Sequence, residues 1–585
     1  MSFLEKNKKL LIIIASVVSS IVVLMLITQL ILGNILENKL ENALSKKEHQ
    51  YYSISIGKVK VNLFTMTLIL KNVDFIPNSA FISDLKLQKS QKQNAFKISI
   101  PVIRIRNIGL LNYLFNKEIG VDNFIIKDAN FYLYKSAIKS TNKPKPNAKH
   151  ISPIRIDSLV IPGINGIDIN KILISNFSIK VVNMKNGDTT FSAKNLDLVY
   201  RHIALIKNEG NNNSLRLAVK DIDIIMKNEE FNLPGGKYSL SFDNLSLNVS
   251  SSLLTINNLK IKPQYSLGKM AKLSKYQYEI YTCDIKKLEV HSIIPMQIIT
   301  TSNIFISNIV VDSMNLSIYK DKHFPFDTTK RPKMPTQSLK LLKDQLHIDS
   351  IIIKNSSLTY SELHVRMDTP MVVNLGNFNV VVSNITSIPD SVAKNPIMAI
   401  KLKANLQNVV PMGVNIYMPM NSVVDTFSFN GWLGKGKMKL FNKILLPAVG
   451  IKFDAGYLDG VKFTANANST YSMGEITMLY HDLDGVVVRN DNEKTNKFLS
   501  WVANSAMIKN NPIENREIRT EPMFFDRVMY KGAGNFLWKT LQSGITATLI
   551  PTMDNKVQKQ IDVKLGTDKK TIRKRERKDK KKKKK

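Results

Sequence analysis

Tyr52–Pro77 reads YSISIGKVKVNLFTMTLILKNVDFIP, and this stretch decides the fold because the chain contains it twice. Moved forward by 186 residues without a gap, it aligns with Tyr238–Pro263, YSLSFDNLSLNVSSSLLTINNLKIKP. Seven of the aligned pairs are identical. Most apolar positions are two residues apart, which is the side-chain period of a strand with one buried face. The sequence therefore predicts a module of alternating strands that occurs twice.

The apolar positions of the two copies coincide, and we expect them to line one face of a sheet. They are Ile54, Ile56, Val59, Val61 and Leu63 in the first copy, and Leu240, Phe242, Leu245, Leu247 and Val249 in the second. A continuous apolar face must be covered, because an uncovered one promotes aggregation. The cover is either a second layer of protein, as in a closed sandwich or barrel, or acyl chains. Alternation alone does not separate these two, since both need the same inward residues.

The duplication continues downstream. Val121–Lys135 matches Ile306–Lys320 at an offset of 185, and IRIDSLVI from Ile154 matches LHIDSIII from Leu346 at an offset of 192. The change in length falls in a Pro-containing loop, as expected for a structural duplication.

A shorter line also recurs within each copy: apolar-x-x-apolar-x-apolar-x-[Asp/Asn/Ser], followed by further apolar positions. We interpret it as strand, tight polar turn and strand. The predicted turns are at Asp128, Asn176, Ser313 and Asn355. The predicted fold is mainly β: an elongated, curved antiparallel sheet with the character of a trough, together with an N-terminal transmembrane helix and a few C-terminal helices.

Leu10–Leu32 contains no charged residue over 23 positions. A helix of that length is about 35 Å long, enough to span a bilayer. A cleaved signal peptide or a buried core helix are the alternatives, but the run exceeds a normal signal-peptide core and no clear Ala-x-Ala site closes it. We therefore predict an uncleaved signal anchor. The basic residues before it place the N-terminus in the cytoplasm.

The expected organisation follows from these features. It comprises a cytoplasmic N-terminus (1–9), a transmembrane signal anchor (10–32), an amphipathic linker helix (33–50), two β-repeat modules (51–237 and 238–426), a C-terminal β-module (427–490), a helical region (491–565) and a disordered Lys-rich tail (566–585). Within the helical region, the predicted helices are Asn496–Ile508 and Phe524–Leu549.

The formal net charge is +36, and such an excess commonly meets nucleic acid, anionic lipid or acidic glycans. Lys569–Lys585 holds 13 Lys or Arg against two acidic residues, a local net of +11. The rest is spread over the body, which argues against nucleic acid as a partner. The tail is either a solvated end or a contact with anionic headgroups. The candidates for that contact are Arg573, Lys574, Arg575, Arg577 and Lys578.

No pattern typical of catalysis is found. There is one cysteine, Cys283, which excludes an internal disulfide and is expected to be a small buried apolar residue. HExxH, CxxC, GxGxxG after a strand and the phosphate-binding GxxxxGK[ST] are all absent from the sequence. We therefore expect no enzymatic activity, no metal and no cofactor.

The repeated hydrophobic–Asn–hydrophobic strands, the N-terminal anchor and the passage AGYLDGVKF…NSTYSMGEITMLYHDLDGVVV (455–488) resemble the AsmA-like superfamily. This group contains envelope proteins related to AsmA and TamB and shares its plan with bridge-like lipid-transfer proteins. The resemblance implies a protein anchored in the inner membrane of a Gram-negative-type bacterium. Its periplasmic sheet would curl into an apolar trough that handles phospholipid or serves outer-membrane biogenesis.

Two functions remain open at this point. The first is phospholipid handling in the periplasm through an apolar trough, with membrane phospholipid as the partner. The second is a structural or assembly factor of the cell envelope, whose closed β-body docks envelope assembly proteins through the C-terminal helices and the basic tail. This chain is shorter than the longest members of the superfamily, which favours a partial groove or a helper over a continuous conduit.

Overall fold

The computed structural model describes most of the chain. The described residues are 19, 23, 29, 31, 34–35, 38–39, 47–48, 52–79, 95–109, 115–135, 166–183, 187, 189–207, 215–233, 235–293, 303–342, 345–365, 369–449, 451–487, 508–550 and 553–568.

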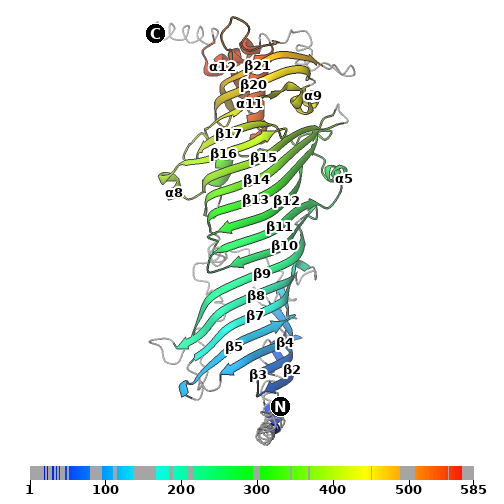
Figure 1. Ribbon diagram of the computed structural model, residues 1–585, viewed down its shortest axis with the longest axis vertical. Coiled ribbons are helices and arrows are strands. Elements are labelled where there is room, and N and C mark those ends of the chain that lie inside the picture. Colours follow the sequence, from blue (N-terminus) through cyan, green and yellow to red (C-terminus); the bar gives the residue numbers. More distant parts are fainter. Residues whose placement is uncertain are drawn as a thin grey trace, which may run out of the picture. The chain divides into compact units, whose positions relative to one another are not determined.

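The described part of the chain is mainly β with few helices, which confirms the predicted class (Figure 1). It divides into two compact units. Unit 1 comprises Met1–Glu229 and Asn244–Ser251, and unit 2 comprises Glu230–Asp243 and Ser252–Lys585.

Unit 1 is built from consecutive strands that pair in chain order. They are β1 (Lys47–Glu48), β2 (Tyr52–Asn62), β3 (Thr67–Pro77), β4 (Ala95–Gly109), β5 (Glu118–Lys127), β6 (Asn130–Lys135), β7 (Gly166–Asn183), β8 (Thr189–Lys207) and most of β9 (Leu215–Asn232). β5 and β6 follow one another along the same line, since both pair with β4 and both pair with β7.

Unit 2 contains the remaining strands, and β10 (Tyr238–Asn248) contributes to both units. The strands of unit 2 are β11 (Leu253–Pro263), β12 (Glu279–His291), β13 (Ile304–Asp321), β14 (Leu346–Leu363), β15 (Met371–Thr386), β16 (Ile397–Leu406), β17 (Val410–Pro419), β18 (Phe427–Leu433), β19 (Gly436–Lys437), β20 (Ile451–Ala467), β21 (Tyr471–Val487) and β22 (Thr520–Asp526). Its helices are α5 (Leu267–Lys272), α7 (Pro335–Lys340), α8 (Pro389–Lys394), η2 (Met438–Phe441), α9 (Asn442–Val449), α11 (Ala533–Leu549) and α12 (Met553–Leu565).

The sheet is not purely antiparallel, which corrects the prediction. β5 and β6 pair with β7 in parallel, and β13 pairs with β14 in parallel. Parallel neighbours need a long crossover to return the chain to the same end of the sheet. In unit 2 that crossover runs from Asp321 to Leu346 and contains α7. The segment is the Pro-containing loop of the sequence pattern, and its length allows β14 to run in the same direction as β13.

The polar residue of the recurring line does not reverse the chain, so the predicted tight turns are wrong. β7, β13 and β14 run through Asn176, Ser313 and Asn355, and β6 begins just after Asp128. These four residues have a left-handed backbone, with φ of 53°, 56°, 52° and 56°. Asn and Asp adopt this conformation more readily than most residues with a side chain. The pattern therefore marks a kink within a strand.

Each kink shifts the alternation by one residue, so apolar side chains on both sides of it share one face. Val311 and Met314 are three residues apart, on opposite sides of Ser313, yet they belong to one hydrophobic cluster. In a regular strand, an odd separation would place them on opposite faces. Kinks in neighbouring strands contact one another, since Nδ2 of Asn176 donates to Oδ1 of Asp128 at 2.6 Å.

The C-terminal helices differ from the prediction. The predicted helix Phe524–Leu549 is divided, because Phe524 lies in β22 and α11 begins only at Ala533. Met523 and Phe524 belong to two different hydrophobic clusters, as expected for neighbouring residues of a strand, whose side chains project to opposite faces. The sequence prediction missed α12. The predicted helix Asn496–Ile508 and the Lys-rich tail from Lys569 onward lie almost entirely outside the described residues, as does the linker helix 33–50, in which β1 is a described strand.

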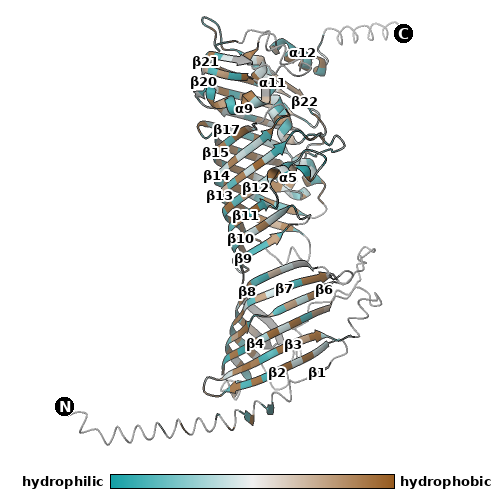
Figure 2. Cartoon of the chain, turned by 90° about the vertical axis from the view of Figure 1, so that its right-hand side faces the viewer, coloured by the Kyte–Doolittle hydropathy of each residue, from teal (hydrophilic) through white to brown (hydrophobic). Residues whose placement is uncertain are grey.

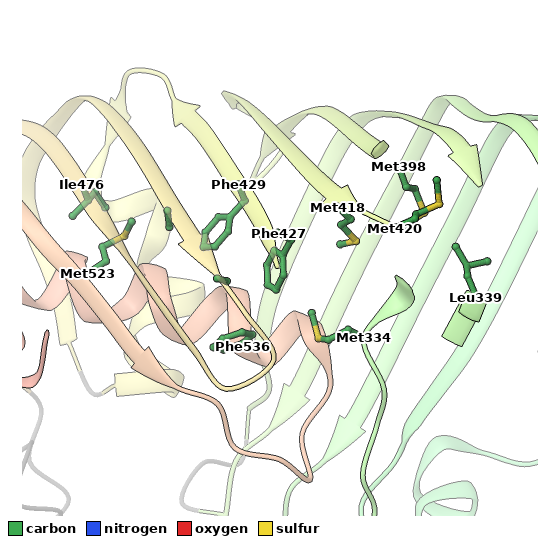
Figure 3. Packing of buried hydrophobic residues seen from close by; sticks show 12 residues of the cluster. Met334, Leu339, Met398, Met418, Met420, Phe427, Phe429, Ile476, Met523 and Phe536 are labelled. Carbon is green, nitrogen blue, oxygen red and sulfur yellow. The ribbon is translucent and has the colours of Figure 1, made fainter. Parts of the chain in front are cut away.

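α11 covers the end of the unit 2 sheet (Figure 3). Phe536 packs among Phe427, Phe429 and Met523, with Met398 and Met418 further along the same cluster.

The helix comes close to the strands at Gly544. A Cβ added to this glycine would lie 2.5 Å from Cγ2 of Ile476 and 2.5 Å from Cγ of Met523. The loss of helix propensity at this glycine, about 1 kcal/mol, is therefore offset by close packing.

Candidate functional site

Three rows of cross-strand partners make one face of the unit 2 sheet apolar from β11 to β17. The first row is Ile256, Leu288, Val311, Ile353, Val380, Leu402 and Val414. The second row is Leu254, Val290, Ile309, Ile351, Val382, Ile400 and Ile416. The third row is Ile261, Cys283, Leu316, Leu358, Leu375, Leu406 and Val410. Directly opposed residues project to the same side of a sheet, and we call this side the apolar face of unit 2.

The middle of the apolar face is lined by strands alone. The cluster around Val311, Phe378 and Val380 takes every member from β12 to β17, and none of its described members belongs to a helix. Most side chains of the three rows are half-buried, including Ile353 and Leu402. The core of a closed sandwich buries such residues almost completely. The described residues therefore leave apolar surface accessible on this face.

The opposite face of the same strands is mixed. The row that alternates with the first apolar row is Thr255, Glu289, Val310, Ile352, Val381, Lys401 and Asn415. Lys401 and Val381 are exposed. Figure 2 shows the resulting alternation of hydrophobic and hydrophilic residues along the strands. Among the described strands β11 to β17, the uninterrupted apolar rows therefore lie on one face.

Unit 1 has an apolar face of the same construction. Four of the five first-copy candidates lie in cross-strand rows. Ile54 is followed by Phe75, Ile98, Phe131 and Ile179; Val59 by Leu70, Ile103, Ile126 and Ile174; Val61 by Leu68, Ile105, Phe124 and Ile172; and Ile56 by Val73 and Ile100. Val59 is buried and the other three are half-buried. Leu63 lies outside β2, in the turn before β3.

The second-copy candidates lie on or beside β10. Leu240 and Phe242 belong to unit 2, and Phe242 is buried with its ring centroid 6.0 Å from that of Phe231. Leu245 and Leu247 are half-buried in unit 1.

Val249 also belongs to unit 1, in the turn after β10, where its backbone N–H donates to the carbonyl of Ile222 at 2.9 Å. The anionic-surface candidates Arg573, Lys574, Arg575, Arg577 and Lys578 lie outside the described residues.

A series of aromatic ring contacts, which the sequence analysis did not predict, crosses unit 1 and includes Phe75 and Phe131 of the Ile54 row. Ring centroids are 4.6 Å apart for Tyr52 and Phe75, 5.2 Å for Phe75 and Phe96, and 6.0 Å for Phe96 and Phe131. The residues come from β2, β3, β4 and β6. Strand pairing that is invisible in a single sequence brings these rings together.

The apolar face of unit 2 ends in a charged rim. Two residues beyond the third row along β12, β13 and β14, the partners are Tyr281, Ile318 and Tyr360; two residues further they are Glu279, Lys320 and Glu362. At about 3.3 Å per residue, this charged row lies about 13 Å from the third apolar row. The face therefore passes from aliphatic to aromatic to charged side chains along the strands.

Glu362 is the most connected residue of the rim. It is 8% exposed, forms an ion pair with Lys322, lies 2.8 Å from Nε2 of His364 and accepts a hydrogen bond from the Tyr360 hydroxyl at 2.7 Å. Burial by itself would raise its pKa, but the contacts with His364, Lys322 and Tyr360 lower the pKa of Glu362 to about 2. Burial and the Glu362 charge raise the pKa of Tyr360.

Replacing Glu362 by glutamine is expected to lower stability at neutral pH by about 2 kcal/mol, because it leaves the half-buried Lys322 without its anion. The carboxylate has a lower pKa in the folded protein, about 2, than its ordinary value of 4.5. Its stabilisation is therefore complete above pH 4.5 and is lost as the pH falls through about 2. Calorimetry of E362Q should show a flatter loss of stability between these values. The control is Glu475, an exposed residue of β21. An equal effect of E475Q would contradict the stabilising role of the Glu362 carboxylate.

A pocket of about 460 Å³ lies at the ends of strands β16, β17, β18, β20 and β21. Tyr417, Ser428, Asn466 and Met473 line it and are successive cross-strand partners. Their row alternates with the one that contains Phe429, and the pocket also borders Phe427 and Ala467 of the cluster that α11 covers. Among its described lining residues, none belongs to the three rows of the apolar face.

No family model matches the chain, and a search of curated proteins finds no match either. Among the described residues, helices that combine the length and the hydropathy of a membrane span are not found, and most of the predicted anchor 10–32 lies outside them. Gln29 is one of its few described residues; its side-chain amide donates to the carbonyl of Val61 at 2.6 Å and accepts from the N–H of Leu63 at 2.7 Å.

Proposed function

We propose that the protein handles phospholipid, with acyl chains lying along the apolar faces of its sheets and headgroups remaining in water. The observation that carries this proposal is the strand-only lining of the middle of the apolar face of unit 2, where most side chains are half-buried. An acyl chain that covers this face would gain about 0.8 kcal/mol for each CH₂ removed from water. Holding lipid in this way needs no catalytic group.

The proposal includes the arrangement and the location that the sequence suggests. The sheet would form a trough built from an internal duplication, in which the apolar rows of unit 1 and of unit 2 both take up acyl chains. The segment 10–32 would anchor the chain in the inner membrane, with the β-rich body in the periplasm. The resemblance to the AsmA-like superfamily and the 23 uncharged residues of Leu10–Leu32 support this location.

Site-specific photocrosslinking in cells tests this function. A benzophenone amino acid at Leu402, on the apolar face, is expected to yield a covalent lipid adduct detectable by mass spectrometry. Its chain neighbour Lys401 projects from the opposite face and should yield none. Equal adducts at both positions, or none at Leu402, would contradict the proposal.

A further inference from the structure

The charged rim of unit 2 has more positive than negative charge. Four lysines gather there, and we call them the lysine cluster: Lys320, Lys322, Lys531 and Lys539. Two carboxylates face them, Glu279 at 2.7 Å from Nζ of Lys320, and Glu362 in contact with Lys322. Four cations against two anions leave an excess of two positive charges.

Two distant parts of the chain supply the lysine cluster. Lys320 and Lys322 lie at the end of β13, whereas Lys531 precedes α11 and Lys539 lies within it. Nζ of Lys531 is 4.4 Å from the ring centroid of Phe326, and Nζ of Lys320 is 5.4 Å from the same centroid. The two ammonium groups therefore lie close to the same ring, on the side of the sheet that α11 covers.

The lysines from the α11 segment are not neutralised. Lys539 donates to Oε1 of Gln542 at 2.7 Å, and Lys531 lies over the rings of Phe326 and Tyr530. Within the part of the chain that the structure describes, neither makes an ion pair with a carboxylate. Burial first, and then the charges of the neighbouring lysines, lower the pKa of both Lys531 and Lys539. An anion placed among them would relieve this repulsion.

The position of the cluster relates it to the apolar rows. Glu279 and Lys320 lie four residues beyond the third apolar row along β12 and β13. Tyr281 and Tyr360 lie between the third apolar row and the charged row. Tyr281 is 44% exposed. Tyrosine favours boundaries at which one end of the ring is apolar and the other is wet. Beyond that boundary, lysine ammonium groups are good partners for phosphate oxygens.

Building on the proposed function, we propose that the lysine cluster binds the phosphate group of a phospholipid whose acyl chains lie on the apolar face of unit 2. The positive excess of the cluster favours an anionic phosphate group, and Tyr281 and Tyr360 lie where the lipid would pass from acyl chain to headgroup. The site would select lipids by their phosphate and would fix the direction in which a lipid lies along the strands.

A competition between two lipids tests the site. The full-length protein in mild detergent is stripped of lipid and offered phosphatidylglycerol and diacylglycerol with the same acyl chains, and the bound lipids are counted by native mass spectrometry. The wild-type protein is expected to prefer phosphatidylglycerol by about ten-fold, equivalent to about 1.4 kcal/mol. The double variant K531Q/K539Q should lose most of this preference and still bind diacylglycerol. The control K401Q/K403Q removes the same charge from exposed positions of β16 and should keep the preference.

The outcomes separate this inference from the proposed function. An unchanged preference in K531Q/K539Q, or no preference in the wild-type protein, overturns the phosphate site and leaves the lipid-handling function standing. Failure of the wild-type protein to bind either lipid overturns the lipid-handling function. Titration with inorganic phosphate separates the two sources of phosphate: a cluster that binds inorganic phosphate in a protein with no preference for phosphatidylglycerol would overturn the headgroup assignment. Should the double variant unfold, the single variants K531M and K539M carry the test, because neutral side chains remove the cost of burying charge.

Discussion

Replacing Ile353 by aspartate is expected to reduce the lipid that copurifies with the protein by about ten-fold, equivalent to about 1.4 kcal/mol. The same replacement at Ile352 is expected to leave the lipid within about two-fold of the wild-type amount. Ile353 lies in the first row of the apolar face, between Val311 and Val380. Ile352 lies in the opposite row, between Val310 and Val381.

The two positions form a matched pair. Both are isoleucines of β14, both are half-buried, and both variants add one negative charge. A carboxylate on the apolar face would have to lose its hydration whenever an acyl chain covers it, which is costly. On the opposite face the carboxylate stays hydrated beside the exposed Val381.

The measurement is lipid extraction and mass spectrometry of the two variants purified in the same mild detergent. Circular dichroism of both variants checks that each is folded, so that a difference in lipid content does not reflect unfolding. Equal lipid content in I353D and I352D would contradict the assignment of the apolar face. A loss of lipid in I352D alone would place the lipid on the face opposite to the apolar face and would also contradict the proposal.

Replacing Gly474 by alanine is expected to lower the stability of unit 2 by about 3 kcal/mol. A Cβ at this position would lie 2.1 Å from the carbonyl oxygen of Thr464 and 2.6 Å from Cα of Ala465. Both atoms belong to the backbone of β20, which cannot move aside without disturbing its pairing with β21. Gly474 also pairs with Met523 of β22, under α11.

Gly460 provides the control for this variant. Its nearest neighbour to an added Cβ is the carbonyl oxygen of Leu433 at 3.5 Å, an ordinary contact, so G460A should stay within about 1 kcal/mol of the wild-type protein. Urea unfolding followed by tryptophan fluorescence measures both variants, since Trp432 and Trp538 lie in unit 2. Similar unfolding midpoints for G474A and G460A would contradict the close approach of the strands.

The alternation of the sequence predicts the class of fold because it is a local property. The alternation of apolar residues shifts by one position between Ile56 and Val59. The predicted inward residues Ile54, Ile56, Val59 and Val61 nevertheless all lie on cross-strand apolar rows of unit 1. Strand pairing extends such rows automatically, since each strand repeats the same pattern. For this reason the apolar rows of β13 and β14 could be anticipated from Ile306–Lys320 and its neighbours.

Other features could not be predicted because they depend on contacts between distant residues. Asn176 and Asn355 looked like turn residues, and a left-handed backbone suits a kink as well as a turn. The sequence does not say which, because strand direction is set by the pairing of β5 and β6 with β7. In the lysine cluster, Lys320 and Lys531 lie near each other because α11 packs against the sheet. The spacing of these residues in the sequence does not predict that contact.

Native mass spectrometry of the full-length protein, purified in mild detergent and followed by lipid extraction, tests the central claim most directly. We expect acyl-chain lipid to remain bound in a defined stoichiometry and to dissociate only when the protein unfolds. A monodisperse, protease-resistant protein free of lipid would contradict it. That result would favour a closed β-body and an assembly role through the C-terminal segment.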